Sequence, residues 1–401
     1  MKRLLSYIFL IFCIIADCAA QCPIRFTGNN HAQVGIYIEE IATGKKLADY
    51  NSETSMTPAS ILKCVTCATA LNILGPDFRF ATEFFLVGPS PREGVAEMIV
   101  KASADPTTGS REFPATSHLP DSISFALKNI GINYIGGGIR IDGAILPDSG
   151  GIVPQWEVED ISHSYGVGLY PVNWYDNYFQ EDLIIPDPPH YFRQLMMENF
   201  NTNEIDIDEK YVAADSIPGT NDTLFVYRHF SPSAKQIMRS LMVRSDNLMA
   251  EGILRAIRPY EHRDSAIWTM RNHWINKGID LEFSRILDGN GLARGNSISA
   301  RQIGKILTSM TKSGYCDVYL QLFPLAGKQG TVARFLKGTR LEERLLLKSG
   351  TMSGVHCYAG YLLNKKGGKP THTVVIMVNN FYCNRNKIRK AIESYLLNKL
   401  P

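Results

Sequence analysis

The stretch from Pro58 to Leu74 constrains this chain most, because it combines a helix start, a reactive pair and an apolar run. Ser60 falls in the first turn of the predicted helix, where unpaired backbone N–H groups and the helix dipole favour a developing negative charge. Lys63 lies three residues later, so its ammonium shares a face with the Ser60 hydroxyl. The residues after Lys63 are almost all apolar or small, and a Gly-Pro pair follows Leu74. The pattern predicts a buried helix with a glycine cap.

The Ser-x-x-Lys spacing suits nucleophilic catalysis. A serine hydroxyl is a weak nucleophile until a base takes its proton, and a desolvated lysine with a lowered pKa can be that base. The alternative is a helix cap beside a solvated charge. The same spacing recurs from Ser309 to Lys312, but there it closes a predicted helix, where the dipole has the wrong sign for a nucleophile. We therefore place the candidate pair at Ser60 and Lys63.

A second candidate is the Ser245-x-Asn247 motif, which interrupts a predicted helix over residues 234–255. Its functional interpretation is a proton-relaying hydroxyl and a substrate-binding carboxamide. The alternative is a helix cap, since serine and asparagine are common caps. Tyr175-x-Asn177 is a rival for this motif, but it lies in a presumed insertion.

A third candidate follows the predicted strand that ends at Lys348, where Ser349, Gly350 and Thr351 come next. The lysine would supply positive charge, the hydroxyl would bind a carboxylate, and the glycine would let a substrate backbone lie along the strand. A plain turn at the strand end is the alternative. The same letters at residues 312–314 close a helix and are rejected.

The N-terminus predicts export. Residues 1–3 are basic, residues 4–15 are largely apolar, and small residues up to Ala20 offer a cleavage site, which is the pattern of a secretory signal peptide. Lipidation at Cys18 or Cys22 is a second possibility, although the residues before both cysteines disfavour it. We expect a periplasmic protein. With no further span in the sequence, we expect at most peripheral membrane association.

Composition excludes other classes. A net charge of +3, without a run of lysine or arginine, argues against nucleic acid as a partner. Cys64 and Cys67 lie one helical turn apart beside Lys63, but no second pair or histidine cluster completes a zinc set. We interpret both as small core residues, with a local disulfide as the alternative in an oxidising compartment. We expect no metal and no cofactor.

The order of predicted elements indicates an α+β fold. A hairpin over residues 33–51 and the Ser60 helix open the mature chain, and three strands and a helix close it after residue 344. We therefore expect a signal peptide at 1–20 and one domain built from 21–80 and 231–401. An α/β accessory region over 81–230 would be inserted between them. Within that region a helix followed by a strand recurs faintly, ending near residues 142 and 208.

Read together, Ser-Ile-Leu-Lys, Ser-Asp-Asn and Lys-Ser-Gly occur in the order typical of β-lactamases and penicillin-binding proteins. The chain resembles the class C low-molecular-mass penicillin-binding proteins of the penicillin-binding protein 4 type. Further matching segments are Ala104–Thr107, Trp156–Asn173, Arg244–Glu251, Asp288–Arg294, Pro324–Thr331 and Lys348–Gly354. The wide gap between Ser60 and Ser245 is typical of this type, because an extra domain is inserted there.

The resemblance implies a penicillin-binding, β-lactamase-like domain in which an antiparallel sheet is flanked by helices. It implies a D-alanyl-D-alanine carboxypeptidase/endopeptidase that acts on peptidoglycan stem peptides and that β-lactam antibiotics inhibit covalently. Ser60 would be the acylated nucleophile and Lys63 its base, while the backbone N–H groups of Ser60 and Thr351 would form the oxyanion hole. Ser245 would relay protons, Asn247 would bind the substrate amide and Lys348 would supply a positive field. The expected substrate-binding residues are Ser349, Gly350, Thr351, Ser353, Arg294 and Asp142.

Two other functions stay open at this point. A β-lactamase or D-peptide esterase could use the same fold, although no deacylating glutamate can be identified from the sequence. A catalytically idle cell-wall binding protein is the alternative from another class. It would have no need of all five residues Ser60, Lys63, Ser245, Asn247 and Lys348.

Overall fold

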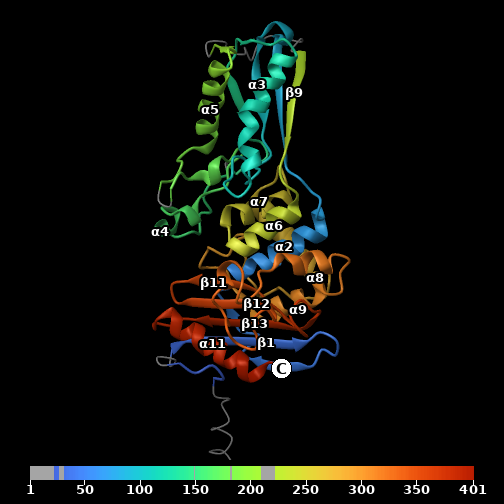
Figure 1. Cartoon of the computed structure of the whole chain (residues 1–401), viewed down its shortest axis with the longest axis vertical. Helices are drawn as coiled ribbons and strands as arrows, with labels where there is room; N and C mark the ends of the chain where they lie inside the picture. Colours follow the sequence, from blue (N-terminus) through green and yellow to red (C-terminus); the bar gives the residue numbers. More distant parts are fainter. Residues whose placement is uncertain (1–21, 27–30, 149, 181–182, 209–221) are drawn as a thin grey trace, which may run out of the picture.

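A computed structural model describes residues 22–26, 31–148, 150–180, 183–208 and 222–401. The predicted signal peptide, 1–20, lies outside the described residues. Across those ranges no helix combines the length and the apolar character that a membrane crossing requires. The molecule is elongated, with the N- and C-terminal segments in one body and most of residues 81–230 extending from it (Figure 1).

A five-stranded antiparallel sheet forms the base of the molecule, in the order β11-β12-β13-β1-β2. The first strands, β1 (Gln33–Glu40) and β2 (Lys46–Tyr50), are the predicted hairpin. The last are β11 (Leu345–Met352), β12 (Val355–Leu363) and β13 (Pro370–Asn379). Because β1 pairs with β13, the two ends of the chain close one sheet, and the predicted α+β class is confirmed.

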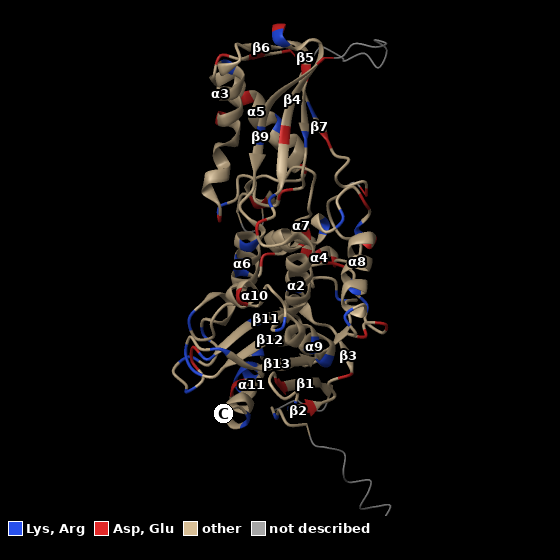
Figure 2. Ribbon diagram, turned by 90° about the vertical axis from the view of Figure 1, so that its right-hand side faces the viewer, with Lys and Arg blue, Asp and Glu red and all other residues tan. Residues whose placement is uncertain are grey.

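Both faces of this sheet are buried, and alternation along each strand separates them. In β1, Tyr37 contacts the helical layer, whereas Ile36 and Ile38 face the opposite side. Helix α11 (Arg385–Lys399) covers that opposite side with the buried residues Ile388, Ile392 and Leu396. Figure 2 shows the sheet between α11 and the helical layer.

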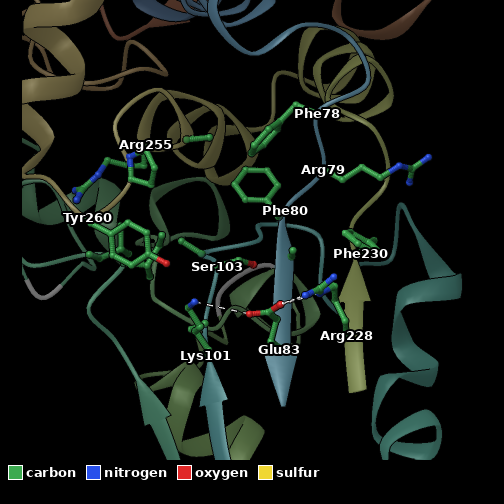
Figure 3. A pocket seen from close by; sticks show the side chains of 17 residues that line it. Phe78, Arg79, Phe80, Glu83, Lys101, Ser103, Arg228, Phe230, Arg255 and Tyr260 are labelled. Atoms are coloured by element: carbon green, nitrogen blue, oxygen red, sulfur yellow. Dashed lines mark hydrogen bonds and ion pairs between the residues drawn. The ribbon is translucent and has the colours of Figure 1, made fainter. Parts of the chain in front are cut away.

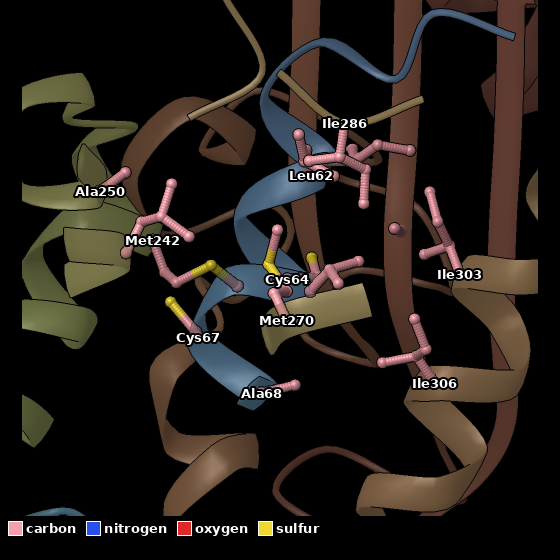
Figure 4. Close-up of a cluster of buried hydrophobic side chains, with 14 of the residues drawn as sticks. Leu62, Cys64, Cys67, Ala68, Met242, Ala250, Met270, Ile286, Ile303 and Ile306 are labelled. Carbon is pink, nitrogen blue, oxygen red and sulfur yellow. The ribbon is translucent and has the colours of Figure 1, made fainter. Parts of the chain in front are cut away.

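Helix α2 (Leu62–Leu74) is the centre of the helical layer. Every residue from Leu62 to Leu71 is buried, as expected for a helix that is apolar on all sides. Its neighbours include Met242 on one side and Ile303 on the other (Figure 4), and Met270 also belongs to this cluster. The surrounding helices are α6 (Ala234–Arg244), α7 (Asn247–Ala256), α8 (Arg263–Ile275), α9 (Ala300–Met310) and α10 (Cys316–Leu322).

Residues 81–230 build a second sheet with its own apolar core. Its strand order is β7 (Ile139–Asp142), β5 (Val95–Lys101), β4 (Ala81–Ser90) and β9 (Asp222–Phe230). The other elements of this region are α3 (Leu119–Asn129), α5 (Pro188–Thr202), α4 (Val158–Ile161), β6 (Tyr134–Ile135) and β8 (Asp206–Ile207). The two-stranded pair β3 (Ser55–Met56) and β10 (Ile298–Ser299) belongs to the first body.

The recurring helix–strand unit is confirmed. Helix α3 leads to β6, helix α5 leads to β8, and the two short strands pair in parallel. The two helices also contact each other. Helix α5 begins at Pro188, because proline is favoured at the first position of a helix.

The 81–230 region leaves and rejoins the first body at one place. Ala81 and Phe230 are paired residues of β4 and β9, and the Phe80 and Ser231 backbones bond each other just below them. We propose this as the domain boundary. One part of the region returns to the first body, because Val153 and Trp156 belong to the core around α2.

The sequence patterns missed two elements. Strand β9 has a single buried residue, Val226, so it carries no clear alternation of apolar and polar side chains. In helix α8 the exposed Trp268 blurs the buried stripe of Ala266, Ile267, Met270 and Trp274.

Candidate active site

Ser60 lies in a single 3₁₀ turn, Ala59–Ile61, that leads directly into α2. Ala59 has a positive φ of 47°, an unusual conformation for a residue with a side chain. Gly291 packs against this turn so closely that an added Cβ would lie 2.0 Å from the Ala59 carbonyl oxygen. The turn therefore fixes Ser60 at the start of α2, which ends at Leu74 before Gly75, as predicted.

Lys63 is fully buried and its ammonium meets three oxygen atoms. Its Nζ donates to Ser60 Oγ at 2.9 Å, to Asn247 Oδ1 at 2.6 Å and to the Asn290 carbonyl oxygen at 2.7 Å. Burial lowers the pKa of Lys63 to about 8, although the carboxylates of Asp288 and two other acidic residues act in the opposite direction. The amine is therefore within reach of its neutral, basic form.

The three contacts of Lys63 define what the neutral amine does. A neutral amine has two N–H donors and one lone pair, whereas the ammonium has three donors. The oxygens of Asn247 and Asn290 have no hydrogen to donate, so each of them accepts a hydrogen bond from one of the two N–H groups. The lone pair is then directed at Ser60 Oγ, which is the geometry of a general base.

Ser245 occupies the break between α6 and α7 and adopts a left-handed conformation, with φ 67° and ψ 34°. Asp246 caps α7 by accepting a hydrogen bond from the Met249 N–H at 2.8 Å. The predicted interruption of the helix is confirmed. It allows Asn247 to enter α7 with its carboxamide directed at Lys63.

The carboxamide of Asn247 is held from both sides. Its oxygen accepts from Lys63, and its Nδ2 donates to the Tyr165 carbonyl oxygen at 2.7 Å. Tyr165 belongs to the 81–230 region, so that region contributes directly to the site. A carboxamide nitrogen carries two hydrogens, which leaves one for a substrate carbonyl.

Lys348, in the middle of β11, is the second buried lysine. Its Nζ donates to Ser245 Oγ at 2.9 Å and to the Ser349 carbonyl oxygen at 2.7 Å. Burial, followed by the charge of Lys63, lowers the pKa of Lys348 to about 7. The hydroxyl of Ser349 pairs with that of Thr331 at 2.7 Å.

Strand β11 is an edge strand, and only part of its edge is covered. The Leu347 N–H donates to the Pro324 carbonyl oxygen, and the Ala326 N–H donates to the Leu345 carbonyl oxygen. Beyond these bonds the strand passes along the Ser60 turn. An added Cβ on Gly350 would lie 3.0 Å from the Ser60 nitrogen and 2.7 Å from the Pro58 carbonyl oxygen. Glycine is therefore required where the strand passes the nucleophile.

A cavity of about 620 Å³ opens over Ser60. Three arginines line it, Arg244, Arg294 and Arg385, together with the carboxylates of Glu159 and Asp160. Its other lining residues are Ser60, Tyr165, Ser245, Asn247, Gly291, Leu292, Thr351, Met352 and Ser353.

Most of the predicted site residues meet here, with one exception. Asp142 ends β7, where its carboxylate accepts from the Ala144 N–H at 3.0 Å, and it does not line the cavity. The acidic residues of the 81–230 region that do line it are Glu159 and Asp160, both on the short helix α4. The only sequence signal for Glu159 and Asp160 was their position inside Trp156–Asn173, one of the segments that carried the family resemblance.

Buried acidic residues support the site from behind, and the sequence patterns missed their role. Asp288 accepts from the N–H groups of Gly291 and Ala293 and from the Trp156 indole at 2.9 Å. Glu251 accepts from the backbone of residues 289 and 290. Both lie inside segments that carried the family resemblance, which was the available signal.

The rejected motifs have structural roles. Lys312 follows the end of α9 and is exposed. Asn177 donates to the Gly168 carbonyl oxygen and to Asn173 within the 81–230 region. Cys64 and Cys67 are free thiols in the core around α2. Among the described residues, no three His, Cys, Asp or Glu side chains converge as metal ligands would.

A second cavity, of about 340 Å³, lies where the two bodies meet (Figure 3). Phe80, Phe230 and Tyr260 are among its aromatic walls, and Glu83 pairs with Lys101 and Arg228 at one side. None of the predicted site residues lines it.

Comparison with known proteins identifies relatives along almost the whole chain. Residues 26–184 and 176–398 match the family described as D-Ala-D-Ala carboxypeptidase 3 (S13). A D-alanyl-D-alanine carboxypeptidase of Actinomadura sp. is 22% identical over 419 residues, which is 83% of this chain and 76% of the relative. The D-alanyl-D-alanine carboxypeptidase DacB of Haemophilus influenzae is 21% identical, over 88% of this chain and 86% of its own.

Solved structures share the fold. Penicillin binding protein 4 of Haemophilus influenzae superposes with a TM-score of 0.78 at 18% identity, covering 92% of this chain and 96% of that one. The same protein has been solved in complex with a β-lactam. A predatory peptidoglycan endopeptidase of Bdellovibrio bacteriovorus gives a TM-score of 0.57 at 16% identity, with 92% of each chain covered.

Proposed function

Because this chain belongs to the D-Ala-D-Ala carboxypeptidase 3 (S13) family, we propose how its residues carry out that family's reaction. The protein is a serine hydrolase, a D-alanyl-D-alanine carboxypeptidase that acts on peptidoglycan. The observation that carries the proposal is the position of Lys63, whose Nζ lies 2.9 Å from Ser60 Oγ.

In the proposed acylation, Ser60 Oγ attacks the carbonyl carbon of the penultimate D-alanine while the Lys63 amine takes its proton. The new oxyanion accepts hydrogen bonds from the backbone N–H groups of Ser60 and Thr351. This placement is supported by Gly350, which brings β11 against the Ser60 turn. The C–N bond then breaks, and the terminal D-alanine leaves with a proton on its nitrogen.

The proton for the leaving amine would come from the Ser245 hydroxyl, which Lys348 resupplies across 2.9 Å. Proton exchange with solvent then returns Lys63 to its neutral amine and Lys348 to its ammonium. Water attacks the acyl carbonyl carbon while Lys63 takes a proton from it. The ester C–O bond to Ser60 breaks, Lys63 returns that proton to Ser60 Oγ, and the shortened stem peptide leaves. No cofactor takes part in this sequence.

The charges around the cavity support a peptide substrate that carries both a carboxylate and an ammonium group. Arg244, Arg294 and Arg385 offer binding partners for a terminal carboxylate, and Ser353 lines the same cavity. Glu159 and Asp160 offer partners for an ammonium on the stem. We assign the acidic contact to these two residues in preference to Asp142, which the cavity does not include.

We further propose that β-lactam antibiotics acylate Ser60 and that the protein is exported to the periplasm. The β-lactam complex of the Haemophilus influenzae structure supports the first proposal, and the basic and apolar pattern of residues 1–20 supports the second. Cleavage of D-amino-acid cross-links, an endopeptidase activity, is the second candidate reaction. The open edge of β11 favours it, because a longer peptide could continue along that strand.

The proposal is tested by intact-protein mass spectrometry after brief exposure to benzylpenicillin. We expect one drug mass on the wild type and none on Ser60→Ala, and D-alanine release from a stem pentapeptide by the wild type alone. Rapid drug turnover without a lasting adduct would indicate a β-lactamase. A folded wild type that reacts with neither compound would indicate a cell-wall binding protein.

A further inference from the structure

Glu251 holds the loop whose carbonyl contacts the base. Its Oε1 accepts from the Gly289 N–H at 2.7 Å and from the Asn290 N–H at 3.0 Å. Asn290 in turn presents its carbonyl oxygen to Lys63 Nζ at 2.7 Å. One carboxylate oxygen is thus separated from the catalytic base by a single residue.

The same helix contacts Lys63 by two routes. Asn247 and Glu251 lie four residues apart on α7 and therefore share one face. Asn247 reaches Lys63 Nζ with its own side chain, whereas Glu251 reaches it through the Asn290 carbonyl. Together they set both acceptors that direct the lone pair of the neutral amine at Ser60.

We propose that Glu251 is a positioning residue for catalysis, which acts on Lys63 by fixing the Asn290 carbonyl and by its own charge. This inference rests on the proposed function, in which Lys63 is the base. A misplacement of about 1 Å in a catalytic contact can cost about a hundredfold in rate, so the hold on this loop is a kinetic as well as a structural feature.

The surroundings of Glu251 give its charge a defined effect. It is 1% exposed, and the charged groups that face it are Asp288 from the loop, Arg263 from α8 and Lys63 from α2. Arg263 Nε lies 3.8 Å from Glu251 Oε2. Burial and the neighbouring Asp288 raise the pKa of Glu251 to about 7, and the ionised carboxylate raises the pKa of Lys63.

Two variants separate the two effects. Glu251→Gln keeps an acceptor oxygen but removes the charge, so we expect most of the wild-type maximal rate and an acid limb displaced to lower pH. Glu251→Leu removes the acceptor, so we expect a maximal rate about a hundredfold lower. The control is Glu39→Gln, another buried glutamate, which bonds Lys305 and Thr308 under α9.

The measurement is the second-order rate of Ser60 acylation by benzylpenicillin, taken across the pH range in which Lys63 titrates, with thermal melting as a check on folding. The inference is overturned if folded Glu251→Leu keeps the wild-type maximal rate, or if the acid limb of Glu251→Gln coincides with that of the wild type. If Glu251→Leu does not fold, the position of the acid limb in the pH profile of Glu251→Gln tests the inference by itself. A wild type that never acylates contradicts the proposed function instead, so the two failures are distinguishable.

Discussion

Lys348 Nζ donates to Ser245 Oγ over 2.9 Å and so joins the edge of the sheet to the break between two helices, across 103 residues of sequence. Ser245 can meet Lys348 because its left-handed backbone turns the side chain out of the helical path. The conformation costs about 1–2 kcal/mol in a residue with a Cβ. Such strain at an interior break is typical of functional positions.

Two substitutions of Ser245 separate the contribution of its hydroxyl to activity from the contribution of its backbone conformation to stability. Both Ser245→Ala and Ser245→Gly remove the proton relay, so we expect equal losses in D-alanine release. Glycine relieves the left-handed strain and alanine keeps it, so the glycine variant should be the more stable by about 1 kcal/mol. Denaturant melts and turnover of a stem pentapeptide check the two parts. Unequal activities would assign the defect to backbone geometry.

The pH dependence of acylation should follow Lys63. Its pKa is lowered from 10.5 to about 8 by burial, and only the neutral amine accepts the Ser60 proton. The acylation rate should therefore rise with pH on the acid side as Lys63 loses its proton, and fall on the alkaline side as Lys348, which supplies the leaving-group proton and has a pKa of about 7, loses its own. The maximum should lie between about pH 7 and 8. Stopped-flow acylation by a chromogenic β-lactam checks this. A profile that lacks the rise on the acid side would exclude Lys63 as the base.

Gly350→Ala should abolish acylation while the fold persists. The new methyl group would meet backbone atoms of Pro58, Ser60 and Ile61 at 2.7–3.0 Å, and backbone cannot move aside as a flexible side chain can. We expect a loss of about 1–3 kcal/mol in stability and a much larger relative loss in rate. Gly314→Ala is the control, because no atom lies within 4 Å of the added group.

Thiol labelling should distinguish the two classes of cysteine. Burial raises the pKa of Cys64 and of Cys357 to about 12, and Cys67 is raised as well, so none of them forms a reactive thiolate in the native protein. Iodoacetamide followed by peptide mapping should modify the partly exposed Cys22, Cys316 and Cys383 first. Early modification of Cys64 would show that α2 opens under native conditions.

The sequence predicted those catalytic residues that lie together in short linear motifs. Ser60 with Lys63 and Ser245 with Asn247 each need only one helix turn or one helix break to be recognised, and local context removed the rival motifs. Lys348 was recognisable because a strand pattern precedes a glycine that a strand interior disfavours. The strongly patterned elements at both ends of the chain gave the main sheet.

The remaining parts of the site depend on tertiary approach. The Asn290 carbonyl and the Tyr165 carbonyl are backbone atoms, which no residue pattern marks, and they reach Lys63 and Asn247 from distant segments. Glu159 and Asp160 line the cavity because α4 folds back onto the first body. Asp142 was predicted to bind substrate because its position in the sequence matches the family, but it lies at the end of β7, outside the cavity lining.

The pairing of Ala81 with Phe230 has a consequence for how such a chain can evolve. Paired strands lie about 5 Å apart, so the first and last residues of the 81–230 region are separated by only one strand spacing. Segments attached this way can lengthen, shorten or be exchanged without pulling on the body that carries them. Substitutions within residues 81–230 can therefore change substrate preference, while Lys63, Lys348 and the five-stranded sheet keep their positions.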